Sequence, residues 1–127
     1  CPYPIGSAYF STPIIERLEN QILKIFWKEI TMLESEFQSA LVKDIKRIVP
    51  DAIVTKNDPT RVQGIPDIII CFGKKYAMLE CKRSKDAHHQ PNQDYYIDKL
   101  KSWNVFAAFI YPENRACVLE ALRRYFL

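Results

Sequence analysis

The spacing of apolar residues changes abruptly at Pro50, and this change limits the folds open to the chain. Between Pro13 and Lys28, apolar residues recur every three or four positions, which is the spacing of one helical face. A second set recurs at the same spacing up to Pro50, which cannot continue a helix. Thr31 and Glu34 form a capping-box pattern at the start of that second set. We therefore predict two successive helices, the second beginning at Thr31.

After Pro50 the apolar residues form short runs that are typical of strands. We predict strands over residues 52–55, 65–72, 76–82 and 105–111, and a turn at Gly73 makes the middle two an antiparallel hairpin. Helices over residues 92–102 and 113–126 complete the series. The order α, α, β, β, β, α, β, α predicts an α/β domain in which helices flank a mixed sheet.

The composition excludes several classes of protein. The chain of 127 residues is long enough for one domain, and its 48% hydrophobic and 26% charged residues are close to the globular average. No apolar run approaches the roughly 20 residues of a membrane helix, and no signal-peptide pattern is visible. The net charge of +3 permits nucleic-acid binding without requiring it. Because the first residue is not Met, we expect a processed piece of something longer.

The four cysteines indicate that the protein belongs to a reducing compartment. They form neither a CxxC pair nor a zinc-binding spacing. Cys71, Cys81 and Cys117 lie in apolar runs, so we expect buried, reduced thiols. With no membrane helix and no signal peptide, this predicts a cytoplasmic protein.

Three charged residues on the two central predicted strands indicate a metal-binding or catalytic site. Asp67 lies in an otherwise apolar predicted strand, where a carboxylate must be paired, capped or bound to a cation. Glu80 and Lys82 project on one face of the next strand because they are two residues apart. By themselves they are typical of an exposed ion pair, but a hairpin closed at Gly73 brings Asp67 and Glu80 together. Two converging carboxylates suit Mg²⁺ or Mn²⁺, and a lysine beside them can orient an attacking water.

The pattern Pro66-Asp67 followed by Glu80-Cys81-Lys82 resembles the motif of the PD-(D/E)XK nuclease superfamily. The predicted elements from residue 31 to residue 111 match the αβββαβ core of that superfamily. The likeness is strongest to small phage-type and VRR-NUC-type members and to Holliday-junction resolvases. It implies a restriction-endonuclease-like nuclease core over residues 31–127. Residues 1–30 would form an N-terminal arm and an extra amphipathic helix.

The resemblance also implies a role for each residue of the motif. Asp67, Glu80 and the backbone carbonyl of Cys81 would hold Mg²⁺, for which Mn²⁺ can substitute, and Lys82 would position the hydrolytic water. Gln93 stands 11 residues after Lys82, where similar proteins carry a glutamine at the start of the next helix. It would orient Lys82, the water or a phosphate.

Similar proteins also carry a glutamate on the first core helix. Glu34 precedes Phe37 by three residues and Leu41 by seven, so it shares the stripe predicted to face the sheet. We therefore expect Glu34 to join the metal site directly or through water, with Glu36 as the alternative. In the loop after the motif, His88 and His89 are adjacent in a polar segment, which is more typical of solvated or phosphate-contacting side chains than of a proton shuttle.

The resemblance implies a metal-dependent DNA endonuclease that hydrolyses phosphodiester bonds in a bacterial or phage-infected cell. Its DNA substrate stays open between a junction, a flap, a specific duplex site, as in intron homing, and a single strand. The alternatives are a non-cleaving nucleic-acid-binding or assembly module on the same fold, and a protein-interaction module built on residues 13–28. Because that amphipathic helix must bury its apolar face, we expect a homodimer, the alternative being a helix folded back on the sheet.

Overall fold

The computed structural model describes residues 13–58 and 60–127, apart from the side chains of residues 27–32. The predicted arm formed by the first dozen residues lies outside this part of the chain. The described elements are α1 (Pro13–Ile48), β1 (Ile53–Lys56), β2 (Ile68–Phe72), β3 (Lys75–Cys81), α2 (Pro91–Ser102), β4 (Phe106–Ile110) and α3 (Arg115–Phe126). The chain divides into two compact units between Leu33 and Glu34, and α1 runs across this boundary.

Helix α1 is one element of 36 residues, where the sequence predicted two helices. The prediction of a new helix at Thr31 is wrong, and Thr31 and Glu34 lie inside a continuous helix rather than in a capping box. The physical reason is that no proline or glycine occurs between Ile14 and Val49. Without such a residue nothing forces a break, and one threonine inside a helix weakens it only slightly.

The four strands form one mixed sheet in the order β1-β2-β3-β4. Strands β1, β2 and β3 pair antiparallel, whereas β3 and β4 pair parallel. The β2–β3 hairpin turns at Gly73, whose φ of 61° glycine adopts without steric penalty. The parallel pair needs a crossover connection, and α2 provides it. The predicted α/β class, with a mixed sheet flanked by helices, is confirmed.

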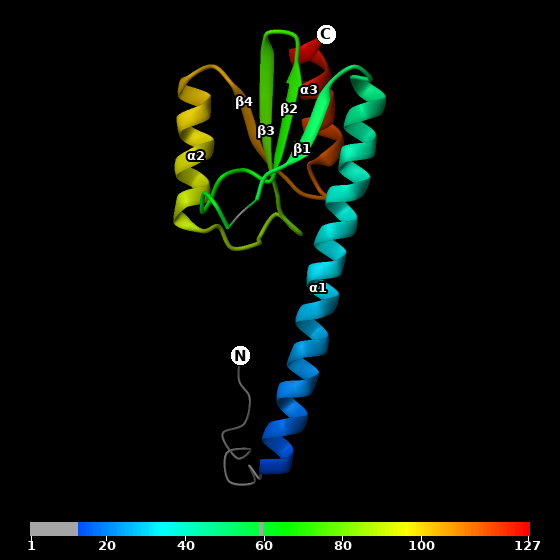
Figure 1. Cartoon of the computed structure of the whole chain (residues 1–127), viewed down its shortest axis with the longest axis vertical. Helices are drawn as coiled ribbons and strands as arrows, with labels where there is room; N and C mark the ends of the chain where they lie inside the picture. The colour runs from blue at the N-terminus through cyan, green and yellow to red at the C-terminus, as the bar shows by residue number, and fades with distance from the viewer. Residues whose placement is uncertain (1–12, 59) are drawn as a thin grey trace. The chain divides into compact units, whose positions relative to one another are not determined.

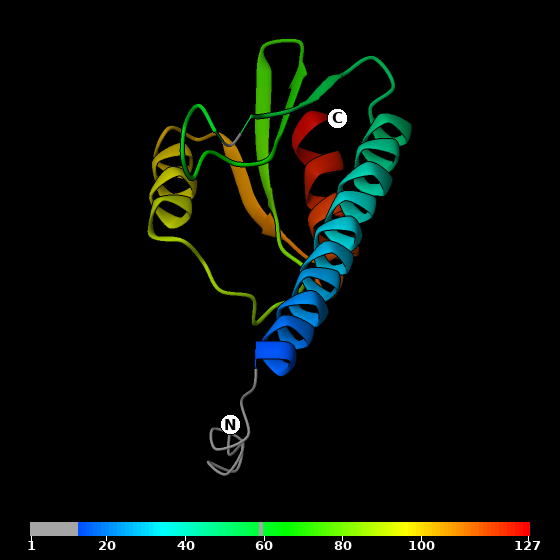
Figure 2. The ribbon, with the colours of Figure 1, turned by 60° about the horizontal axis from the view of Figure 1, so that its bottom comes forward.

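Two apolar clusters lie on opposite faces of the sheet. The larger cluster joins α1 and α3 to the sheet and includes Leu41, Ile45, Ile70, Leu79 and Leu122. The smaller cluster joins α2 to the sheet and includes Ile97, Leu100, Val105 and Ala107. Figures 1 and 2 show α2 on one side of the sheet and α3 with the C-terminal part of α1 on the other. Strand β4 contributes to both clusters, so both of its faces are covered.

Two of the three thiols that the sequence predicted to be buried are exposed. Cys71 and Cys117 lie at the surface, and Cys81 is partly buried; all three thiols are free. Trp103 is 58% exposed at the C-terminal cap of α2, outside the apolar face of that helix. Strand alternation explains Cys71: its neighbour Ile70 is fully buried in the core, so Cys71 projects from the other face of the sheet.

The first unit contains the N-terminal part of α1, in which every position from Pro13 to Phe26 is exposed. Its large apolar side chains include Leu18, Ile22 and Ile25, which form the predicted stripe. Even so, no helix in the described part of the chain combines the length and the hydropathy needed to cross a membrane.

Candidate active site

Asp67 and Glu80 meet at the open end of the β2–β3 hairpin. Asp67 directly precedes β2, so its predicted place inside the strand is wrong by one residue. Ile68 pairs with Leu79, which places Asp67 beside Glu80 on the neighbouring strand. The Oδ2 atom of Asp67 accepts a hydrogen bond from the backbone N–H of Cys81 at 2.9 Å. A side-chain carboxylate therefore accepts the N–H of the last residue of β3, just before β2 begins.

The backbone of Asp67 is fixed by Asn57, a residue to which the sequence assigned no role. The backbone N–H of Asn57 donates to the Asp67 carbonyl at 2.8 Å. Its side-chain Nδ2 donates to the Pro66 carbonyl at 2.7 Å. These two bonds close the base of the loop between β1 and β2. No sequence signal marks them, because an asparagine at the start of a loop is common.

The same loop packs closely against the start of α2. Gly64 has a φ of 89°, and a Cβ atom at this position would lie 2.3 Å from the Cβ of Asn92. The Nδ2 of Asn92 also approaches the Gln63 carbonyl at 3.4 Å. Gly64 thus meets two demands, a left-handed backbone and a close approach to a neighbouring element.

Glu80 is the most deeply buried charged residue of the described chain, with 4% of its surface exposed. Its Oε1 atom accepts a hydrogen bond from Nε2 of Gln93 at 2.9 Å. Its Oε2 atom is buried and has no hydrogen-bond partner within the described residues. A buried carboxylate oxygen without a partner is unfavourable, so the site has one oxygen free to bind a further group.

The environment of the two carboxyl groups disfavours their ionisation. Burial, together with the negative charge of Asp67, raises the pKa of Glu80 to about 8. Burial also raises the pKa of Asp67, against the N–H of Cys81 and the positive charges of Lys82 and Lys56, which lower it. Two adjacent buried carboxylates repel each other unless a cation neutralises them. The metal-free pair therefore retains a proton at neutral pH.

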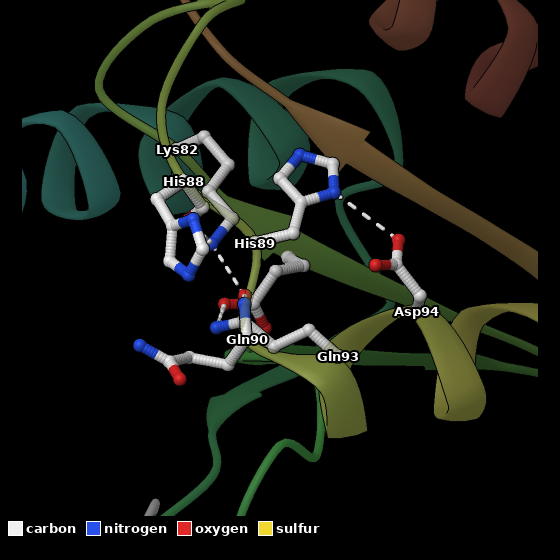
Figure 3. A network of polar contacts seen from close by, with 7 residues as sticks. Lys82, His88, His89, Gln90, Gln93 and Asp94 are labelled. Atoms are coloured by element: carbon white, nitrogen blue, oxygen red, sulfur yellow. Dashed lines mark hydrogen bonds and ion pairs between the residues drawn. The ribbon is translucent and has the colours of Figure 1, made fainter.

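Lys82 is held beside the carboxyl pair by the loop that follows it and by α2. It is 9% exposed, and its Nζ atom donates to Oε1 of Gln93 at 2.5 Å and to the His88 carbonyl at 3.1 Å. Gln93 thus bridges Lys82 and Glu80 through the two ends of its side-chain amide. The Gln93 Oε1 atom also accepts the backbone N–H of Gln90 at 3.0 Å, as Figure 3 illustrates for this group. The sequence prediction had placed Gln93 near Lys82, and the structure brings them together.

Glu34 is exposed, and so is Glu36, so the prediction that Glu34 faces the sheet is wrong. Glu34 lies one turn before the first helical side chain that packs on the core. Burial and then the charges of Asp67 and Glu80 raise the pKa of the Cys81 thiol, and Glu34 adds to this rise. The negative charge of Glu34 therefore influences the residues of the site.

Within the described residues, no three His, Cys, Asp or Glu side chains converge enough to hold a metal ion.

Lys56 is a second cationic residue near the carboxyl pair. Lys56 is the last residue of β1, and its side chain is exposed. Its positive charge lowers the pKa of Asp67. Arg61, in the loop that Asn57 closes, is exposed as well. The exposure of both side chains leaves them accessible to a polyanion.

The donor set fits a hard divalent cation. Asp67 and Glu80 contribute carboxylate oxygens, the ligand type that Mg²⁺ and Mn²⁺ prefer. The decisive observation is that Oε2 of Glu80 is buried without a hydrogen-bond partner. A bound cation would give this oxygen a partner and would neutralise the repulsion between Asp67 and Glu80.

Comparison with known proteins supports the fold. No protein-family model matches the sequence, and no curated protein matches it. Among solved structures, a "VRR_NUC domain protein" matches with a TM-score of 0.57 and 18% sequence identity. The match covers 72% of this chain and 86% of that one. At this identity the likeness shows the fold, which is restriction-endonuclease-like, as the sequence predicted.

Proposed function

We propose that this chain is a metal-dependent DNA endonuclease of the PD-(D/E)XK type. The observation that carries the proposal is the pairing of half-buried Asp67 with buried Glu80, with one unpartnered carboxylate oxygen and Lys82 held beside it. A purely structural ion pair would leave no buried oxygen without a partner. The fold shared with a VRR_NUC domain protein supports the same reading of the site.

The metal would be held by Asp67, Glu80 and the backbone carbonyl of Cys81, with Glu34 acting through water. When bound, the cation supplies Lewis acidity at the scissile phosphate. Glu80 keeps its place through the bond that it accepts from Gln93. Asp67 keeps its place through the bond that it accepts from the N–H of Cys81.

Lys82 would orient the attacking water. An ammonium group has three N–H donors, and two of those on Lys82 are directed to Gln93 and to the His88 carbonyl. The third is available to a water or to a phosphate oxygen. Gln93 would therefore act as a positioning residue, since it holds Lys82 and Glu80 at a fixed separation.

Cleavage of a panel of DNAs in Mg²⁺, at one defined salt concentration, tests the proposal. The panel contains a four-way junction, a flap, a linear duplex, a single strand and a supercoiled plasmid. We expect at least one of them to be cut, and the Asp67→Ala and Glu80→Ala variants to cut none while still binding DNA. Asp98→Ala, which removes an exposed carboxylate on α2, serves as the matched control and should cut normally.

Two outcomes would count against the proposal. Cleavage by either site variant at a rate close to the wild type would show that the site has been placed wrongly. DNA binding by the wild type without cleavage, in Mg²⁺ and in Mn²⁺, would favour the non-cleaving nucleic-acid-binding or assembly module.

A further inference from the structure

The loop between β3 and α2 is fixed to the candidate site at two points. Lys82 donates to the His88 carbonyl at 3.1 Å, and the N–H of Gln90 donates to Oε1 of Gln93 at 3.0 Å. The residue between these two points is His89. Its backbone is therefore held from both sides by the residues that line the carboxyl pair, as Figure 3 shows.

The side chain of His89 is also held, by two contacts of different kinds. Its Nδ1 atom lies 3.1 Å from Oδ1 of Asp94, in the first turn of α2. Its ring stacks on Phe109, with 4.1 Å between the centroids and 21° between the planes. A carboxylate can only accept, so Nδ1 is the donor in this pair and Nε2 is left for another partner.

Phe109 places this imidazole next to the carboxyl pair. Phe109 is the β4 partner of Glu80 in the parallel register, so the two residues lie on neighbouring strands. Both side chains are on the α2 side of the sheet, where Phe109 packs against the α2 cluster and Glu80 bonds to Gln93. The Lys82 ammonium lies 6.0 Å from the centroid of the same Phe109 ring. His89 and Lys82 thus flank one aromatic ring at the edge of the site.

We propose that His89 is the general acid that protonates the leaving 3′ oxygen, and that Asp94 orients its imidazole. The inference rests on the proposed nuclease function and extends it. His89 is half-buried and its imidazole is oriented by a carboxylate, as a proton donor requires, and it contacts the Phe109 ring that also lies near Lys82. His88 lacks these features, because its side chain is exposed and only its carbonyl contacts the site.

The reaction balances with water as the only co-reactant. The water oxygen forms a bond to phosphorus, the bond from phosphorus to the 3′ oxygen breaks, and the electron pair stays on that oxygen. His89 gives the proton of Nε2 to this oxygen, which becomes a 3′-hydroxyl. The attacking water releases one proton to solvent, and His89 regains one from solvent. The other product end is a 5′-phosphate.

A substrate with sulfur in place of the leaving 3′ oxygen tests this role directly. A thiolate departs without being protonated, so a general acid is not needed for that bond. The substrate is the panel DNA that the wild type cuts, made with oxygen or with sulfur at the cleaved position. On the oxygen substrate we expect His89→Ala to lower the single-turnover rate about 100-fold, a usual contribution of general acid catalysis. On the sulfur substrate the same variant should cut as fast as the wild type.

Matched variants separate this role from a structural one. His88→Ala should behave like the wild type on both substrates, and Asp94→Asn should show a smaller defect on the oxygen substrate alone. His89→Asn keeps a donor near Asp94 and is used if the alanine variant fails to fold; it should show the same pattern. A His89 defect that is equal on both substrates, or absent from both, overturns the proposal while leaving the nuclease function intact. A wild type that cuts no DNA of the panel overturns both.

Discussion

Replacing Glu80 with glutamine should stabilise the metal-free protein at alkaline pH. Glutamine keeps the shape of the side chain, and its carbonyl oxygen can still accept the bond from Gln93. The substitution removes only the carboxyl group of Glu80, whose ionisation is disfavoured in the site. The pKa of Glu80 is raised to about 8, from an ordinary value of 4.5, mainly by burial and then by the charge of Asp67.

The sign of the effect follows from where each state binds the proton. Between about pH 4.5 and 8, the unfolded chain has lost the Glu80 proton while the folded metal-free chain retains it. The folded state then binds more protons, so the free energy of unfolding falls as the pH rises through this window. One proton corresponds to a slope of at most about 1.4 kcal/mol per pH unit. From pH 5 to pH 8, we expect the wild type to lose roughly 2 to 4 kcal/mol relative to Glu80→Gln.

Urea unfolding followed by far-ultraviolet circular dichroism, in EDTA at pH 5, 6, 7 and 8, measures this difference. The wild type and the variant share every other titrating group, so the difference between them at each pH reports Glu80 together with its effect on the neighbouring Asp67. Glu113→Gln, which alters an exposed carboxylate, is the control and should show no such trend. Adding Mg²⁺ should then stabilise the wild type and leave Glu80→Gln nearly unchanged, because the variant lacks a metal ligand.

Two results would refute this reasoning. A difference between the wild type and Glu80→Gln that is the same at pH 5 and pH 8 would show that Glu80 is already ionised in the folded protein. A variant less stable than the wild type at pH 8 in EDTA would show that the negative charge is stabilised by other groups.

Three further predictions concern the residues around the site and the first unit. Lys82→Ala should be inactive yet bind Mn²⁺ by calorimetry, and loss of Mn²⁺ binding would give Lys82 a structural role instead. Gly64→Ala should lower the free energy of unfolding by roughly 2 kcal/mol, since it forces a close contact with α2 and a strained φ; an unchanged urea midpoint would contradict this. The homodimer stays a prediction: sedimentation velocity should show a dimer that Leu18→Asp with Ile22→Asp converts to monomer, and a wild-type monomer with and without DNA would refute it.

The sequence predicted the carboxyl pair because the pattern depends on local rules. Glu80 and Lys82 share a face through strand alternation, and the turn at Gly73 fixes which residues of the two strands are neighbours. Asp67 could be placed beside Glu80 from these facts alone. The helix carboxylate could not be placed in the same way, because Glu34 lies where the apolar stripe of α1 leaves the core.

By itself, the sequence determined the order of the strands and of the later helices along the chain. It also determined the hairpin and the three charged residues at the open end of that hairpin. These features follow from periodicity, turn residues and charges within a few positions of one another. The tertiary structure alone decided that Asn57 fixes Asp67 and that His89 stacks on Phe109 beside Asp94. Both depend on contacts between different segments of the chain. The continuation of α1 through Thr31 follows from the lack of proline and glycine in this stretch, to which the prediction gave less weight than to the capping-box pattern. Burial, which raises the pKa of Glu80, is likewise a property of the packed sheet and helices and not of any one segment.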